Sequence, residues 1–184
     1  SVSRGALYVT LDRLEAKVGF GPLACGADLL IAEALLARGS ELNVVLPFDR
    51  DDFVRASVAR GGADWVRRFD DALTRVARVI PATQESYLGD DVLFEHAARL
   101  LEGLAALRAS QLQTAPALLC VIDAAAAGYV GGTLAAFRRW ESHFGAPQVI
   151  DLGELRERNA TVEQSAVGDE PRRAAIARAP STSS

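Results

Sequence analysis

The sequence contains little sulfur and few imidazole groups. Its 184 residues include no methionine, two cysteines and two histidines. Cys25 and Cys120 lie far from each other and from both histidines in the sequence, so no zinc-binding spacing exists. We therefore expect no bound metal or other cofactor. The lack of methionine also predicts that the chain is cut from a longer protein.

Lysine is almost absent, because Lys17 is the only one among 20 basic residues. The formal net charge is −4, and no basic cluster is interleaved with aromatic side chains. These features argue against binding to nucleic acid. No apolar run approaches the length of a membrane span, and the first residues do not have the form of a secretory signal. We expect a soluble, cytoplasmic protein without membrane contacts.

Apolar strands alternate with amphipathic helices through most of the chain. This alternation predicts an α/β fold, a three-layer α/β/α domain over residues 1–155 with a mostly parallel sheet of about five strands. The expected strands are Val18–Leu23, Leu42–Leu46, Arg78–Ile80, Leu118–Ile122 and Val149–Leu152. Residues 156–184 are polar and lack periodicity, which predicts a disordered linker to a neighbouring domain.

Several helices have clear sequence signals. A helical spacing of leucines in Gly5–Lys17 predicts that the chain begins with a helix. Asp49 or Asp51 can cap a short helix that ends at Gly61 and Gly62. The longest helix is expected over Asp90–Leu112, where a leucine seam can pack either on the sheet or on a second copy of the chain. If this seam is exposed, we expect a homodimer.

The stretch from Gly19 to Arg38 reads as a strand, a glycine turn and an apolar helix. Gly26 and its small neighbours allow backbone N–H groups to approach a ligand, and a helix N-terminus attracts phosphate or carboxylate groups. A second glycine loop, Gly128–Thr133, follows the buried strand that ends before Asp123. Ligands of parallel sheets bind at the carboxyl ends of the strands, where both loops are expected.

A purely structural role is the alternative for both loops. Gly26 can serve only the turn, and Asp28 can stabilise only the first turn of its own helix. Thr133 can act only as an N-cap residue. The residue types alone leave the two interpretations open.

The chain resembles a superfamily in three places: Leu23-Ala-Cys-Gly-Ala-Asp28, Val44-Val-Leu-Pro-Phe48 and Gly131-Gly-Thr133. It is similar over residues 18–152 to the Rossmann-like superfamily that joins DNA-processing protein A, the LONELY GUY phosphoribohydrolases and bacterial nucleotide-sensing domains, often called SLOG. The likeness is greatest to bacterial domains that precede tetratricopeptide repeats or class III adenylate/guanylate cyclase domains. The resemblance implies a fused output domain of that kind.

The resemblance also implies a pocket for a nucleotide or a nucleotide-derived small molecule. The two pocket walls that it implies consist of Gly26, Ala27 and Asp28 on one side and Gly131, Gly132 and Thr133 on the other. Cys25, Glu33 and Asp123 are candidates for positions behind these walls.

Two departures from the family pattern affect this interpretation. The family begins with a strand whose carboxyl-end loop contributes to the pocket, whereas this chain begins with a helix. Hydrolytic members carry a glutamate three residues after the threonine, and Ala136 occupies that position here. No catalytic residue is therefore assigned.

Three functions follow from these observations. The first is a non-catalytic, ligand-binding sensory domain of a larger signalling protein. The second is a phosphoribohydrolase like the LONELY GUY enzymes, for which Asp28, Glu33 and Asp123 are the remaining carboxylates that could act as acid or nucleophile. The third is a degenerate scaffold that dimerises through Asp90–Leu112.

Overall fold

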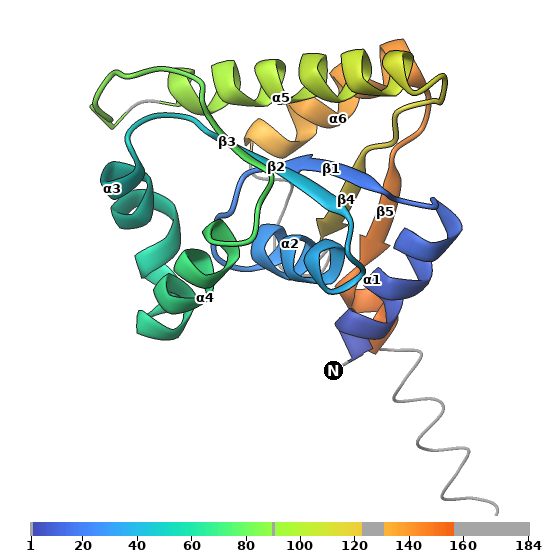
Figure 1. The fold of residues 1–184 in the computed structure, drawn as a ribbon, viewed down its shortest axis with the longest axis horizontal. Coiled ribbons are helices and arrows are strands. Elements are labelled where there is room, and N and C mark those ends of the chain that lie inside the picture. The colour runs from blue at the N-terminus through green and yellow to red at the C-terminus, as the bar shows by residue number, and fades with distance from the viewer. Residues whose placement is uncertain (1, 90, 123–130, 157–184) are drawn as a thin grey trace, which may run out of the picture.

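The computed structural model describes residues 2–89, 91–122 and 131–156 of the chain, in which helices alternate with strands (Figure 1). The α-helices are α1 (Val2–Arg13), α2 (Ala27–Ala37), α3 (Arg50–Phe53), α4 (Ala63–Leu73), α5 (Val92–Gln111) and α6 (Gly131–Phe144). The strands are β1 (Val18–Gly21), β2 (Glu41–Leu46), β3 (Arg78–Pro81), β4 (Leu119–Ile122) and β5 (Gln148–Asp151). Residues 152–156 are helical, and the expected linker otherwise lies outside the described residues.

The strands form two parallel sheets. Hydrogen-bonded neighbours follow the order β1-β2-β3 in one sheet and β4-β5 in the other. Val18 lies opposite Glu41 at the start of the β1–β2 ladder, and Leu119 lies opposite Gln148 at the start of the β4–β5 ladder. The α/β class and the parallel pairing are confirmed. Among the described residues, however, the expected single sheet is divided between β1 and β4.

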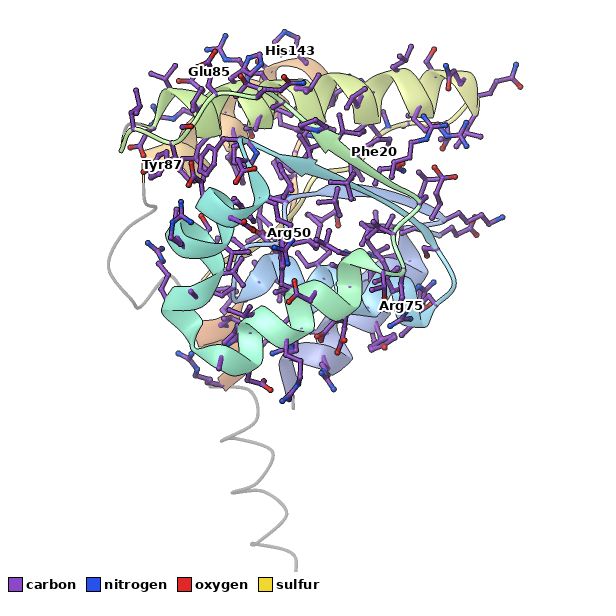
Figure 2. All side chains as sticks on the ribbon, turned by 60° about the vertical axis from the view of Figure 1, so that its left-hand side comes forward. Phe20, Arg50, Arg75, Glu85, Tyr87 and His143 are labelled. Carbon is purple, nitrogen blue, oxygen red and sulfur yellow. The ribbon has the colours of Figure 1, made fainter. Side chains whose placement is uncertain are left out.

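Helices lie on both sides of the strands. Figure 1 shows α5 on one side, with α1, α2 and α4 on the other. Figure 2 shows the same separation from another direction, with α5 on one side of the strands and α3 and α4 on the opposite side. α1 packs against α2, α2 packs against α4, and α5 packs against α6. The helices bury β2 from Leu42 to Leu46, whereas Val79 of β3 and Val149 of β5 stay exposed.

The core lies between the three-stranded sheet and α2, α3 and α4. Leu23, Leu29, Phe48, Phe53 and Phe69 are almost fully buried there. Burial of a leucine or phenylalanine side chain is worth roughly 1.5–3 kcal/mol, so these side chains hold the β1–α2 turn against the sheet. This core fixes the position of the first glycine loop.

Side-chain chemistry also sets the boundaries of several elements. β1 ends at Gly21 rather than at Leu23, because Pro22 has no N–H group for the ladder. The side chain of Asp49 accepts hydrogen bonds from the N–H groups of Asp51, at 2.9 Å, and Asp52, at 3.4 Å, and so caps α3 as expected. The chain continues through a π-helical turn, Val54–Val58, and a 3-10 turn that ends at Gly61.

Arg50 ties α3 to α4. Its guanidinium pairs with Asp70 and lies 5.7 Å from the ring centroid of Phe69. Figure 2 shows Arg50 directed from α3 toward α4. Neither Arg50 nor Asp70 lines the cavity described below.

Two helices differ from their expected forms. α6 begins at Gly131, so Thr133 is its third residue and not its N-cap, which corrects the expected cap. The leucine seam of α5 is only partly packed: Ala97 is buried, whereas Leu107 is 57% exposed. No helix among the described residues has the length and apolar character that a membrane crossing requires.

Replacement of Gly61 by alanine tests the packing under the first glycine loop. A Cβ atom at Gly61 would lie 2.5 Å from Cδ1 of Trp65 and 3.0 Å from Cβ of Cys25. We expect Gly61→Ala to lower the free energy of unfolding by about 1–3 kcal/mol, because overpacking forces these groups apart. Urea denaturation measures the change.

The matched control is Gly103→Ala in the middle of α5. A Cβ atom there would meet no other group within 4 Å. Alanine should stabilise this exposed helical position by roughly 0.5–1 kcal/mol. Equal effects of the two substitutions would contradict the packing described at Gly61.

Candidate functional site

A cavity of about 660 Å³ lies between β1 and β4. Its walls come from β1, α1, α2, α5 and the segment that leads into β4. Residues on these walls include Val18, Phe20, Asp28, Leu101, Leu119 and Trp140. The cavity is largely apolar, with Asp28 as the carboxylate beside the carboxyl end of β1. An apolar cavity with a few polar groups is the usual form of a small-molecule site.

The β1–α2 turn presents backbone donors at the N-terminus of α2. Gly26 is the N-cap residue, with φ of 99°, and no side-chain hydrogen bond caps the helix within the described residues. This backbone conformation favours glycine because it places little strain on a residue without Cβ. The N–H groups of Ala27 and Asp28 belong to the first turn, where an α-helix provides no internal acceptors. These donors and the helix dipole suit an anionic group.

The turn is held by a contact to the π-helical turn. The N–H group of Cys25 donates a hydrogen bond to the carbonyl oxygen of Ser57, at 2.9 Å. Cys25 also packs beside Gly61, in the position where a larger residue would collide. Cys25 therefore joins the β1–α2 turn to the segment that contains Ser57 and Gly61. Its role in a ligand site stays a prediction.

Asp28 carries the most perturbed acidic group near the cavity. Burial raises the pKa of Asp28 from its ordinary 3.8 to about 6, although a hydrogen bond from the backbone of Ala24 favours the charged form. The carboxyl lies in the first turn of α2 and lines the cavity. A carboxylate in this position can accept hydrogen bonds from ligand hydroxyl groups. Its pKa lies close enough to neutrality for the site to be sensitive to pH.

Cys120 shows that β4 lies near the N-terminus of α2. Burial raises the pKa of the Cys120 thiol, and the negative charge of Asp28 raises it further. Such an effect requires that the two side chains be near each other. Cys120 in β4 therefore lies within electrostatic range of Asp28 in α2, although β1 and β4 belong to different sheets.

The second glycine loop is only partly described. Gly131, Gly132 and Thr133 form the first turn of α6, which follows β4. Asp123 and the loop residues 124–130 lie outside the described residues, and so do the side chains of the first turn of α6. We predict that the N-termini of α2 and α6 lie at the same edge of the strands. Their distance across the pocket stays a prediction.

Glu33 lies away from this cavity. Its carboxylate accepts hydrogen bonds from Nε of Arg68, at 2.6 Å, and from a terminal nitrogen of the same guanidinium, at 2.8 Å. Arg4 adds a contact at 3.4 Å. These arginines lower the pKa of Glu33, with the Arg68 hydrogen bond as the main cause. Glu33 lines a separate cavity between α1, α2 and α4, and its ion pair joins α2 to α4.

The cavity residues that the sequence did not predict include two aromatic side chains. Trp140, which is 3% exposed, reaches the cavity from α6, and Phe20 reaches it from β1. Phe20 alternates with Gly19 and Gly21 in the strand, which could have identified it as a side chain on the opposite face from α2. Trp140 has no such signal, because a single tryptophan on a helix is usual in a core.

The backbone donors at the N-terminus of α2 suit an anionic group. No cluster of three or more histidine, cysteine, aspartate or glutamate side chains suited to a metal ion occurs within residues 2–89, 91–122 and 131–156.

Comparison with protein-family models, curated proteins and solved structures finds no match to the chain. The geometry of the cavity and its polar groups is therefore the basis of the function proposed below.

The raised pKa of Asp28 predicts how stability depends on pH. Between about pH 4 and pH 6 the carboxyl holds its proton in the folded protein, whereas in the unfolded chain it is ionised. The free energy of unfolding should therefore fall as pH rises through this range. Each unit of pKa corresponds to about 1.4 kcal/mol, so the fall amounts to about 3 kcal/mol.

The Asp28→Asn variant isolates this effect, because an amide does not ionise. Urea denaturation of both proteins between pH 4 and pH 7.5 gives the difference in their free energies of unfolding. We expect the wild-type protein to lose about 3 kcal/mol relative to the variant across this range. A difference that is constant with pH would show that the carboxyl is not buried as described.

Proposed function

We propose that this chain is a Rossmann-like ligand-binding domain that holds a nucleotide or a nucleotide-derived small molecule without cleaving it. The bound molecule would lie at the carboxyl ends of β1 and β4. In this proposal the two small sheets belong to one doubly wound arrangement. The domain would act as the sensory part of a larger cytoplasmic signalling protein, next to a cyclase or tetratricopeptide-repeat domain.

The observation that carries the proposal is the pairing of two complementary groups in one turn of α2. The N–H groups that follow Gly26 suit a phosphate, and the carboxyl of Asp28 suits a hydroxyl group. A nucleotide carries a phosphate and ribose hydroxyls a few bonds apart. The apolar walls around Phe20 and Trp140 offer surface for a base.

Binding without cleavage is supported by the residue types of the second loop. Ala136 lies in α6 at the position where the resembling hydrolases carry a glutamate. Alanine provides neither a proton nor a nucleophile, and loss of a positioned general acid or base lowers a rate by about 10²–10⁴-fold. Backbone donors at the two helix N-termini do not depend on that glutamate. Affinity can therefore persist without turnover.

Glu33 does not replace the missing glutamate. Its carboxylate is paired with Arg68 on the α4 side of α2, away from the cavity. Asp28 is the remaining described carboxyl at the cavity beside α2. A carboxyl with a pKa near 6 could transfer a proton, so a test for turnover belongs with the binding test.

Replacement of Gly132 by aspartate tests the proposed site. Its carboxylate would stand in the first turn of α6, where it repels a phosphate but is compatible with the helix dipole. We expect calorimetric titration with adenosine 5′-monophosphate or adenosine 5′-diphosphate to show binding to the wild-type protein. The Gly132→Asp variant should bind at least about 10-fold more weakly, which corresponds to about 1.4 kcal/mol.

Gly103→Asp provides the control, since it introduces the same charge at an exposed position of α5 away from the cavity. This control should bind like the wild-type protein. Equal affinity of wild type and Gly132→Asp would remove the second loop from the site. Release of adenine from either nucleotide by the wild-type protein would replace the binding proposal with the hydrolase.

A further inference from the structure

An ion pair joins α6 to α5, which pack side by side (Figure 1). Nε of Arg139 donates a hydrogen bond to Oε2 of Glu102, at 2.8 Å, and a terminal nitrogen of the same guanidinium donates one to Oε1, at 2.7 Å. The side chains of Arg139 and Glu102 are only 22% and 13% exposed. Two parallel hydrogen bonds between a guanidinium and a carboxylate fix the orientation of the groups as well as their distance. The pair therefore constrains how α6 lies on α5.

The sequence of α5 explains why Glu102 pairs with Arg139. Glu95, Arg99 and Glu102 follow one another at steps of four and three residues, which places them on one side of the helix. Arg99 donates a hydrogen bond to Glu95 within α5, at 2.6 Å, whereas Glu102 accepts from the arginine of α6. The hydrogen bond to Glu102 is the main reason why the pKa of Arg139 lies above its ordinary value, and the charge of Glu95 adds to this effect.

Each partner of the pair is next in the chain to a residue of the cavity wall. Leu101 precedes Glu102 and lines the cavity. Trp140 follows Arg139 and lines it as well, with 3% of its surface exposed. The ring centroid of Phe144, one turn later in α6, lies 4.6 Å from that of Trp140. The ion pair thus lies directly behind the part of the wall that Trp140 forms.

The direction of Trp140 depends on the rotation of α6 about its own axis. Neighbouring residues of an α-helix point about 100° apart, because one turn contains 3.6 residues. When Arg139 is fixed on Glu102, the direction of the next side chain is therefore fixed as well. Phe144 cannot set this direction, because it belongs to the same helix and rotates with Trp140. A rotation or shift of α6 would change the surface that the indole presents to a ligand.

The phosphate donors at the N-terminus of α2 are held by different contacts. The β1–α2 turn is fixed by burial of Leu23 and by the hydrogen bond from the N–H group of Cys25 to Ser57. None of these residues belongs to α5 or α6. Loss of the ion pair should therefore move Trp140 without moving the donors of α2. The phosphate end and the aromatic wall of the candidate site can be altered separately.

We propose that Glu102 and Arg139 are positioning residues of the ligand site, and that their ion pair directs Trp140 against the base of a bound nucleotide. This inference rests on the function proposed above, and it names the pair that determines recognition of the base. Stacking of a base on an aromatic side chain contributes about 10-fold or more to affinity. Neither Glu102 nor Arg139 lines the cavity, so the two residues act through Trp140 and not through contact with the ligand.

Two ligands that differ in the base separate these roles. Adenosine 5′-monophosphate carries adenine, a ribose and a phosphate, whereas ribose 5-phosphate lacks the adenine. Calorimetric titration gives the dissociation constant of each ligand for the wild-type protein, for Glu102→Gln and for the control Glu141→Gln. Glu141 is exposed and directly follows Trp140. The control therefore makes the same chemical change beside the indole and leaves the ion pair intact.

Glu102→Gln should bind adenosine 5′-monophosphate about 10-fold more weakly than the wild-type protein, because the base loses its aromatic partner. Its affinity for ribose 5-phosphate should change by less than about 2-fold, because the donors of α2 stay in place. Glu141→Gln should bind both ligands like the wild-type protein. Equal weakening of the two ligands, or weakening of neither, would overturn the assignment.

A double substitution tests whether the two residues act as one unit. Arg139→Gln breaks the same pair from the other helix, so its combination with Glu102→Gln should lose no more affinity than either single change. Losses that add would overturn the proposal. Arg139→Lys provides the test if the other variants do not fold, because lysine keeps the charge but not the planar fork. It should weaken binding of adenosine 5′-monophosphate by about 3-fold or more, and an unchanged affinity would contradict the proposal.

Tryptophan fluorescence reports on Trp140 without any ligand. Trp65→Phe leaves Trp140 as the only tryptophan of the chain. In this background Glu102→Gln should shift the emission to longer wavelengths and increase quenching by acrylamide, whereas Glu141→Gln should not. Unchanged emission in Glu102→Gln, with nucleotide binding by the wild-type protein, overturns only this inference. If the wild-type protein binds neither ligand, the proposed function fails, and the role of the pair in ligand binding fails with it.

Discussion

The divided backbone hydrogen bonding of β1 is the constraint on which the rest of the structure depends. Lys17, Gly19 and Gly21 bond toward β2, and this ladder holds the three-stranded sheet together. Val18 and Phe20 direct their polar backbone groups toward β4 instead. A polar backbone group needs a partner or water, so the space beside β1 must contain one or the other. The cavity lies beside this edge, with Val18 and Phe20 among the residues that line it.

The candidate site lies at the carboxyl end of the same strand. Pro22 ends β1, and Gly26 turns the chain so that α2 begins beside the cavity. Burial of Leu23 and Leu29 fixes the two ends of this turn. The donors of α2 are therefore held in place by packing rather than by a ligand. The anion site that we propose at these donors would lose little conformational freedom on binding.

Asp28 adds a carboxyl group that titrates near neutral pH to the candidate site. Its carboxyl is held at the cavity wall by α2, and burial brings its pKa close to neutrality. A protonated carboxyl donates a hydrogen bond, and an ionised one only accepts. The same residue can therefore recognise a hydroxyl group differently on the two sides of pH 6. Glu33, five residues further along α2, has the opposite behaviour because Arg68 keeps it ionised.

Sequence patterns were sufficient to predict the individual strands of this fold and the region where α3 begins. The apolar runs located the five expected strands, and Asp49 was one of two candidate caps, with Asp51, for the helix that became α3. The strand pairing across the middle of the molecule could not be read in the same way. Apolar character predicts that β1 and β4 are buried, but not whether they contact each other. That depends on a long-range arrangement of α1 and α5.

The site was predictable only where its residues are neighbours in the sequence. The glycine turn and Asp28 are adjacent in sequence, so their shared position follows from one strand, one turn and one helix. Trp140 and Phe20 meet at the cavity only after the two sheets and α6 are packed. Glu33 was placed near the site by its closeness in sequence. The helix turn directs it toward α4, where two arginines are available.

The most direct test of this account is an NMR map of backbone amides during titration with adenosine 5′-monophosphate, with inorganic phosphate as a parallel titration. The account predicts that the largest chemical-shift changes occur at Ala27 and Asp28 for both anions. The nucleotide should also shift Phe20, which lies on the apolar wall. Lys17 and Thr114, at the opposite end of the cavity, should not change. Changes centred on Lys17 and Thr114, or none at Ala27 and Asp28, would contradict a ligand site at the carboxyl end of β1.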